Sequence, residues 1–300
     1  MAQHPAEASS DTLTDPSAQA PNEGEAVKDF FSTDEIFLRV LATADHELEQ
    51  PLPTFAWGAL AAGLIIGFSF LARVVFAEAL PGSSPVVHKL LYPVGFIFVI
   101  LGRYPLFTEN TLTPVTLALT RFASLRELLR IWGLSFGLNV VGAFLFALLL
   151  AHTGLLSAEA AELAHGFGEH LLTTSWADAF FKALLAGWLI AGLVWLVHAA
   201  RDTAARLLLI WLVVYLQVSA DLFHCIVGSV ETLYTVLTGG ATFGAYLLDF
   251  LLPVTLGNMV GGVVFVAVLN YAQFSPDKRA VRGEQLSWHE WWLGRAAPKE

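Results

Sequence analysis

Charged residues are scarce in this chain of 300 residues, in which Asp, Glu, Lys and Arg make up 14% and hydrophobic residues 56%. A soluble globular domain carries about 25% charged residues, so the composition excludes that class. Cysteine occurs once, at Cys225, which excludes an intrachain disulfide. His165 and His170 are five residues apart and do not share a helix face, so they lack zinc-site spacing. The sequence therefore predicts an integral membrane protein with no metal site and no cofactor.

Long apolar runs take the place of the missing charge. Four of them are long enough to cross a hydrocarbon core, which takes about 20 apolar residues in a helix: 53–77, 131–153, 183–200 and 250–273. Two other runs, 90–102 and 207–220, are too short to cross alone. The first ends at Arg103 and resumes after "LFTENTLTP", and the second ends at Asp221 and resumes through "FHCIVGSVETLYTVLTG". We interpret both as broken helices, which predicts six crossings within a membrane channel domain over 51–275.

The two ends of the chain are more polar. Residues 1–31 are acidic and rich in Ala, Ser and Pro, and predict a disordered cytoplasmic tail without a signal peptide. Ser32 and Glu35 have capping-box spacing and precede apolar residues at helical intervals, which predicts an amphipathic cytoplasmic helix over 32–50 that lies on the membrane surface or against the bundle. Residues 276–300 form a predicted cytoplasmic C-terminal tail. Its tryptophans favour the lipid headgroup level: Trp288, Trp291 and Trp292.

Basic residues gather in particular connections between the apolar runs. Arginines and lysines cluster over 121–130, 201–206 and 278–282, whereas the loop 154–175 carries three glutamates and no Lys or Arg. By the positive-inside rule the basic connections are cytoplasmic and that loop is outside. The sequence thus predicts a multi-pass protein of the inner or plasma membrane, with both termini in the cytoplasm.

Two motifs recur in the same order in the two halves of the chain. "ALAAGLII" (59–66) resembles "ALLAGWLI" (183–190), and "NVVGAFLF" (139–146) resembles "NMVGGVVF" (258–265). Small residues are common wherever membrane helices pack closely, so either match alone could arise by chance. A repeat of three crossings places its second copy upside down, which predicts two inverted three-helix repeats with broken second and fifth helices. Adding 119 to the number of Pro105 gives His224, so the two breaks are predicted symmetry mates.

The breaks indicate a path through the protein. A break exposes backbone N–H and C=O groups, which lipid cannot satisfy, so it survives only inside protein or along a cavity. It also places a half-helix N-terminus, which favours an anion, at mid-membrane. Four polar side chains could cap the new helix start, and Pro114 suits its first turn: Thr108, Asn110, Thr111 and Thr113.

Ionisable residues stand at both breaks. Glu109 is interpreted as a buried acid that caps the half-helix or pairs with Arg103, because an intramembrane charge needs a partner. Asp221 and Glu231 flank the second break with the same ambiguity. His224 is the candidate functional residue, because a side chain with a pKa of about 6.5 can supply positive charge or a proton at that depth.

These motifs, in order, resemble the formate/nitrite transporter family across about 33–275: "LFTENT", "SFGLNVVGA", "ALLAGWLIAGLVWL", His224 and "PVTLGNMVGG". The closest resemblance is to the YfdC-like branch. The resemblance implies a homopentamer of aquaporin-like protomers, each with its own pore for a small monovalent anion such as formate or nitrite, or its neutral acid.

The same resemblance implies the pore residues. His224 and Thr108 would lie between two hydrophobic constrictions. One constriction, on the cytoplasmic side, would comprise Tyr92, Phe96 and Val194, and the other Leu106, Phe107 and Gln217. Asn139 and Asn258 complete the set of candidate pore residues. The chain departs from the family pattern at three positions, with Ser175 in place of a vestibule lysine, Gln217 in place of an aromatic residue and Gly228 in place of an asparagine.

Other functions stay open on the sequence alone. A channel for a neutral solute such as water or hydrogen sulfide is favoured by the missing vestibule lysine and disfavoured by His224. A non-conducting membrane scaffold would recruit a partner through its acidic or tryptophan-rich end. An enzyme is disfavoured, because no nucleophile–base pair or metal set is apparent near the breaks. The expected partners are membrane lipid and a small molecule, with no nucleic acid.

Overall fold

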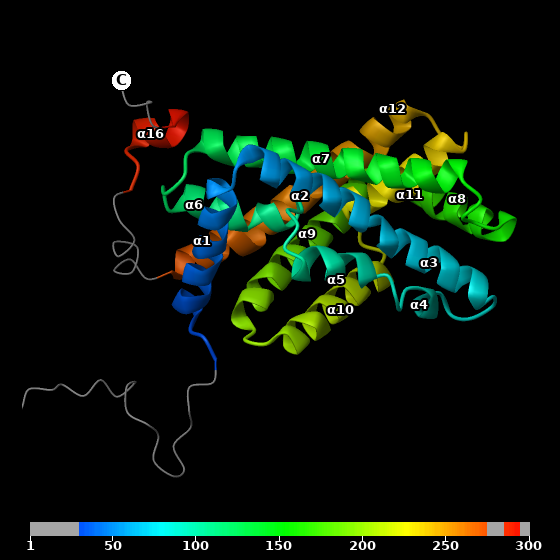
Figure 1. Ribbon diagram of the computed structural model, residues 1–300, viewed down its shortest axis with the longest axis horizontal. Coiled ribbons are helices and arrows are strands. Elements are labelled where there is room, and N and C mark those ends of the chain that lie inside the picture. Colours follow the sequence, from blue (N-terminus) through cyan, green and yellow to red (C-terminus); the bar gives the residue numbers. More distant parts are fainter. Residues whose placement is uncertain (1–29, 275–284, 295–300) are drawn as a thin grey trace, which may run out of the picture. The chain divides into compact units, whose positions relative to one another are not determined.

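The protein is described here by a computed structural model that covers residues 30–274 and 285–294, which are almost entirely helical (Figure 1). The predicted acidic tail over 1–31 therefore lies outside the described residues except for its last two. The helices are α1 (Thr33–Glu49), α2 (Leu52–Ile65), α3 (Gly67–Ala79), α4 (Pro85–His88), α5 (Val94–Leu101), α6 (Thr113–Leu119), α7 (Leu125–His152), α8 (Ala158–Thr173), α9 (Trp176–Ala199), α10 (Thr203–Ser219), α11 (Cys225–Leu237), α12 (Phe243–Ala245), α13 (Leu252–Gly262), α14 (Leu269–Gln273) and α16 (Trp288–Leu293).

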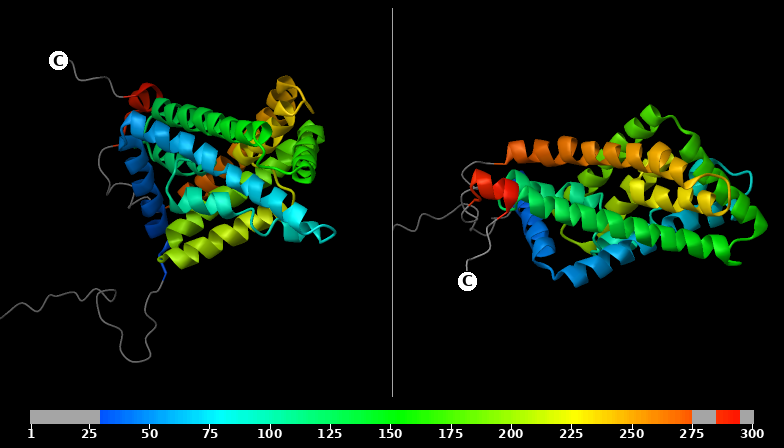
Figure 2. Two further views of the ribbon diagram at one scale, coloured as in Figure 1. Left: turned by 45° about the vertical axis from the view of Figure 1, so that its right-hand side comes forward. Right: turned by 90° about the horizontal axis from the view of Figure 1, so that it is seen from above.

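Four helical stretches among the described residues are long and apolar enough to cross a membrane. They begin one to seven residues before the four predicted runs and end within two residues of them: Leu52–Ala79, Leu125–His152, Trp176–Ala199 and Phe243–Gln273. The first joins α2 and α3, which follow one another as one rod beside α7 in Figure 1 and in the left view of Figure 2. The last joins α12, α13 and α14 through two π-helical segments, Tyr246–Leu251 and Val263–Val268.

The long helices pack in pairs through glycines. α2 lies against α7, where a Cβ on Gly63 would come within 2.1 Å of the Asn139 carbonyl oxygen. α9 lies against α13, where a Cβ on Gly187 would come within 2.2 Å of the Asn258 carbonyl oxygen. Both distances are far below contact, so only glycine permits either approach.

The two predicted breaks are present. α5 ends at Leu101 and α6 starts only at Thr113, with a 3₁₀ turn over Glu109–Thr111 between them. α10 ends at Ser219, and α11 starts at Cys225. Two residues after each half-helix, the backbone enters the left-handed region, at Arg103 and at Asp221, both with φ of 56°. That conformation ends a helix and is uncommon in residues other than glycine, so both half-helices stop in the same way.

The amphipathic helix α1 begins at the expected capping box, in which the Ser32 Oγ accepts from the Glu35 N–H and the Glu35 carboxylate accepts from the Ser32 N–H. Its apolar face is buried against α6 and the end of α14, through residues such as Phe37 and Val40. Of the two settings that the sequence allowed for this helix, the structure has the one against the bundle.

The segment 154–175, expected as a loop, contains the 16-residue helix α8. Ser157 caps it, and its buried face of small residues packs on α11. A Cβ on Gly168 would lie 2.1 Å from the Thr235 Oγ1, so the two helices touch closely. The spacing of Ala160, Ala164 and Gly168 was the signal for this helix in the sequence.

The predicted C-terminal tail is described only over 285–294, where α16 lies beside the start of α7. The Trp291 Nε1 donates to the Ala118 carbonyl at 2.7 Å, and the Arg121 guanidinium lies 4.8 Å from the centre of the Trp288 ring. Trp288 and Trp292 remain largely exposed. Their role at the lipid headgroups stays a prediction.

Candidate functional site

The two breaks meet at a hydrogen bond between His224 and Thr108. The His224 Nε2 and the Thr108 Oγ1 are 2.8 Å apart, and the two residues are only 2% and 1% exposed. The Phe96 ring lies edge-on to the imidazole, with ring centres 5.0 Å apart. Residues 116 apart in the chain thus form one buried polar contact under an aromatic ring.

The other nitrogen of His224 fixes the tautomer. Nδ1 accepts from the backbone N–H groups of Ile226 at 3.2 Å and Val227 at 3.3 Å, so the imidazole caps α11. An accepting ring nitrogen carries no proton, so the proton of the neutral ring is on Nε2 and is donated to Thr108. A protonated ring would lose both capping bonds. This geometry therefore favours a neutral His224.

The first break is held by the side-chain amide of Asn139. Its Oδ1 accepts from the Phe107 N–H at 2.8 Å, and its Nδ2 donates to the carbonyls of Ala59 at 2.7 Å and Pro105 at 3.0 Å. Asn139 is fully buried and bonds only to backbone groups. It therefore supports the break from behind.

Asn258 makes the same three contacts at the second break. Its Oδ1 accepts from the Cys225 N–H at 2.9 Å, and its Nδ2 donates to the carbonyls of Ala183 at 2.7 Å and Phe223 at 2.9 Å. The correspondence of these bonds makes Phe223 the counterpart of Pro105 in the first break. His224 then corresponds to Leu106. The offset of 119 residues between the two halves, which paired His224 with Pro105, was therefore wrong by one residue at the breaks.

The side-chain caps expected at the start of α6, the helix that follows the first break, are absent. No described side chain caps α6, whose N-cap residue is Leu112. Thr111 bonds instead to the carbonyl of Thr108, and Thr113 donates to the Glu47 carboxyl at 3.1 Å. Pro114 does lie in the first turn of α6, as expected.

One cavity adjoins His224, and a second adjoins the chain neighbours of Thr108. A cavity of about 420 Å³ beside α1 is lined by Leu106 and Val194, among other residues. A pocket of about 20 Å³, room for one water molecule, is lined by His224 and Tyr92 near α8. Tyr92 and Val194 therefore lie in different cavities, and Leu106 shares the cavity of Val194. The grouping of constriction residues expected from the resemblance was wrong for Tyr92 and Leu106.

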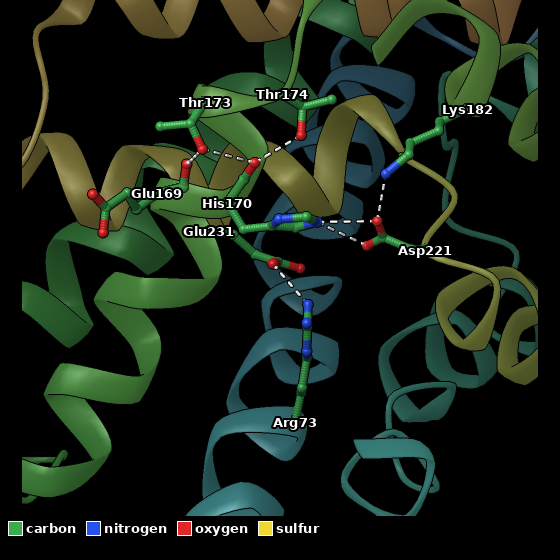
Figure 3. Close-up of polar contacts among 8 residues, drawn as sticks. All are labelled: Arg73, Glu169, His170, Thr173, Thr174, Lys182, Asp221 and Glu231. Atoms are coloured by element: carbon green, nitrogen blue, oxygen red, sulfur yellow. Dashed lines mark hydrogen bonds and ion pairs between the residues drawn. The ribbon is translucent and has the colours of Figure 1, made fainter. Parts of the chain in front are cut away.

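Ion pairs surround the small pocket (Figure 3). The Arg73 Nη1 is 3.1 Å from the Glu231 Oε2, and Asp221 accepts from Lys182 at 2.5 Å and contacts the His170 Nε2 at 3.0 Å. Figure 3 shows these side chains converging from α3, α8, α9, α11 and the second break. The ambiguity about Asp221 and Glu231 is thereby resolved, because each acid is paired with a cation.

Glu109 behaves differently from those two acids. It forms no ion pair with Arg103, and its Oε1 is buried without a hydrogen-bond partner among the described residues. Both sequence interpretations of Glu109, as a cap and as the partner of Arg103, were therefore wrong. Glu109 lines the large cavity together with Glu47 of α1, and burial raises the pKa of Glu47 to about 7 against the opposing hydrogen bond from Thr113.

The three departures from the family pattern have structural settings. Ser175 caps α9, with its Oγ bound to the N–H and the carboxylate of Asp178, so it brings no cation. Gln217 is fully buried, and both polar atoms of its side chain lack a partner among the described residues. At Gly228 a Cβ would lie 2.4 Å from the Phe250 ring, so that ring fills the space of an asparagine side chain.

Several known proteins are similar to this chain in sequence. Residues 34–272 match the sequence profile described as formate/nitrite transporter. The chain is 34% identical to the inner membrane protein YfdC of Escherichia coli over 78% of this chain and 76% of that protein. It is 31% identical to a probable formate transporter of Methanothermobacter thermautotrophicus, over 76% and 91% of the two chains.

Solved structures share the fold. A pentameric formate channel with formate bound matches with a TM-score of 0.62 and 24% identity, over 74% of this chain and 97% of that one. An ion channel of the FNT family matches with a TM-score of 0.70 and 22% identity, over 81% and 98%.

Proposed function

Because the chain belongs to the formate/nitrite transporter family, we propose that it is a membrane channel or transporter for small monovalent anions, such as formate or nitrite, or for their neutral acids. The observation that carries this proposal is the His224–Thr108 hydrogen bond between the two cavities. A solute that moves from one cavity to the other has to replace this bond with bonds of its own.

The proposed architecture has six crossings in two inverted repeats. It is supported by the equal contacts of Asn139 and Asn258 and by the equal backbone turns at Arg103 and Asp221. We assign both termini to the cytoplasm and the protein to the inner or plasma membrane. A cysteine at Glu162 should then react with an impermeant reagent in intact cells, over a low background because Cys225 is buried. Labelling only after cell lysis would contradict this orientation.

We assign one pore to each protomer of a homopentamer, by analogy with the pentameric formate channel that shares the fold. In the pore, the Nε2–H of a neutral His224 and the Thr108 hydroxyl turn toward the solute. A neutral donor pair offers directional hydrogen bonds without holding an anion as a fixed charge would, which allows release. Phe96 lies against the imidazole and excludes water, whereas the Phe107 ring packs on Trp132 and Phe136 of α7. The amide of Gln217, which has no partner among the described residues, offers a further polar contact.

The decisive test is flux into proteoliposomes for formate, nitrite, chloride, hydrosulfide and water. The wild-type protein should pass formate or nitrite and exclude chloride. His224→Asn is an informative variant because asparagine is a good helix cap, so α11 keeps its start while the donor to Thr108 is lost. Both His224→Asn and the near-isosteric Thr108→Val should lower flux across the whole pH range. Wild-type rates in both variants, with normal assembly by size-exclusion chromatography, would remove the pair from the pathway.

A neutral solute is the second candidate. It is supported by the α8 side of the site, where Arg73 and Lys182 are both paired with carboxylates and Ser175 is engaged in a cap. Few free cations then gather anions on that side. Flux of water or hydrogen sulfide without formate or nitrite would favour this candidate, and silence across the panel would favour a scaffold.

A further inference from the structure

The large cavity beside α1 carries ionisable groups of both signs on several elements. They come from α1, the first break, α9 and α10: Arg39, His46, Glu47, Arg103, Tyr104, Glu109, His198 and Arg206. Among the described residues, neither Glu47 nor Glu109 lies within ion-pairing distance of a cation. The cavity therefore combines arginines that attract anions with two carboxyl groups that lack a counter-charge.

The carboxyl groups of Glu47 and Glu109 line the same cavity inside the protein, so a negative charge on one disfavours a negative charge on the other. Glu109 has a buried Oε1 without a partner, and Glu47 accepts one hydrogen bond, from the Thr113 hydroxyl. Asn110, which is 1% exposed and lines the same cavity, has an Nδ2 without a partner. A buried carboxylate that has neither a cation nor a full set of donors is costly, so both groups are expected to hold protons. An unused amide donor beside them is suited to an incoming carboxylate.

On the opposite side of the His224–Thr108 pair, the carboxylates are neutralised by cationic side chains and not by bound protons. There Glu231 is neutralised by Arg73, and Asp221 by Lys182, with the His170 Nε2 in contact with the same carboxylate (Figure 3). His224 itself is a poor source of protons, because its Nδ1 is engaged by two backbone N–H groups. Protonated carboxyl groups on the α1 side are thus the best placed proton donors in the described pathway.

We propose that Glu109, with Glu47 beside it, is the proton-donating site for the permeating anion on the α1 side. The inference rests on the proposed function and names the group that carries the proton. An arriving carboxylate binds between the arginines and the Asn110 amide. The O–H bond of Glu109 then breaks, and an O–H bond forms on the anion, which proceeds as the neutral acid past Leu106. Glu109 is left as a carboxylate and recovers a proton from Glu47, which exchanges with water in the cavity.

The surrounding charges fit this step. Arg103 and Arg206 raise the local concentration of anions and stabilise the Glu109 carboxylate that each transfer leaves behind. His46 and His198 are the two imidazoles of the cavity, and the His198 ring is engaged by the Thr43 hydroxyl and the Val194 carbonyl.

The test uses Glu109→Gln, which preserves shape and a hydrogen-bond donor but cannot give up a proton. Formate flux in proteoliposomes should fall about 100-fold, the lower end of what a positioned proton donor contributes. Flux of hydrogen sulfide, which needs no proton, should be unchanged. Glu109→Asp should recover part of the formate flux. Glu49→Gln is the matched control, because Glu49 lies on the exposed face of α1 two residues from Glu47 and should leave both fluxes unchanged.

An infrared measurement gives a second readout that does not depend on flux. The wild-type protein at neutral pH should show protonated-carboxyl C=O absorption that loses the share of Glu109 in Glu109→Gln, leaving that of Glu47, and keeps its full intensity in Glu49→Gln. Wild-type formate flux and an unchanged band in Glu109→Gln would overturn the inference while the proposed function stands. A wild-type protein that passes no anion would overturn the proposed function itself, and the proton-donating role with it.

Discussion

Replacing Asn258 by alanine removes three hydrogen bonds at once from the second break. The Cys225 N–H and the Phe223 carbonyl would lose the partner described for each of them, whereas the Ala183 carbonyl would keep its bond within α9. A buried polar group left unpaired costs about 1–3 kcal/mol, and losing a bond at a group that keeps another costs about 0.5–1.5 kcal/mol. Together these come to roughly 2.5–7.5 kcal/mol, a large part of the usual stability of about 5–15 kcal/mol.

The assay is thermal unfolding in detergent, with oligomer assembly followed by size-exclusion chromatography. The matched control is Asn270→Ala, which removes a single bond of 2.9 Å to the Val266 carbonyl. Asn258→Ala should lower the unfolding temperature several times more than this control does. Asn258→Asp should not rescue it, because a carboxylate keeps the bond from Cys225 but turns oxygen lone pairs toward two carbonyls. Equal shifts for Asn258→Ala and Asn270→Ala would refute the role of Asn258 in holding the break.

Three further predictions concern packing, pH and charge. Gly187→Leu should abolish assembly, because the Cβ alone would lie 2.2 Å from the Asn258 carbonyl, whereas Gly192→Leu, with no atom within 4 Å of its Cβ, should assemble normally on size-exclusion chromatography. Burial raises the pKa of Glu47 to about 7, so the stabilisation from its bound proton is complete below pH 4.5 and is lost as the pH rises through about 7. The unfolding temperature should therefore fall between pH 5 and pH 8, and it should fall less in Glu47→Gln. Equal slopes in the two proteins would contradict this burial. Ser175→Lys should raise anion flux most at low ionic strength, where screening is weakest, and a gain independent of salt would argue against an electrostatic effect.

The breaks could be predicted from the sequence because their residues conflict with the apolar runs around them. Arg103 and Asp221 end apolar runs that are too short to cross a membrane as a helix. A longer helix through either position would place a charged residue among apolar ones. The repeated motifs indicated that Asn139 and Asn258 have equivalent positions, because an asparagine and a glycine recur together in each half. The family resemblance supplied the Thr108 and His224 pair, which the structure brings into contact.

Other features depend on partners far away in the chain, which periodicity does not identify. Nothing in the segment around His224 indicates that its Nδ1 faces the start of its own helix, since histidine is not a usual cap. The pairing of Glu231 with Arg73 joins residues 158 apart, and the isolation of Glu109 depends on where α1 lies. α8 was missed because its buried face has three small residues and a single leucine, and the small residues have too little hydropathy to distinguish the helix from a loop.

The order of the breaks and their asparagines along the chain has a consequence for synthesis. Each break precedes its asparagine: residues 102–112 emerge from the ribosome before Asn139, and residues 220–224 before Asn258. Until the next long helix has been made, the backbone groups of the break lack the amide that satisfies them, and each half-helix is too short to cross the bilayer alone. The half-helices therefore have to wait beside the insertion machinery or at the membrane surface. Integration then proceeds in blocks that close with α7 and with α13, rather than one helix at a time.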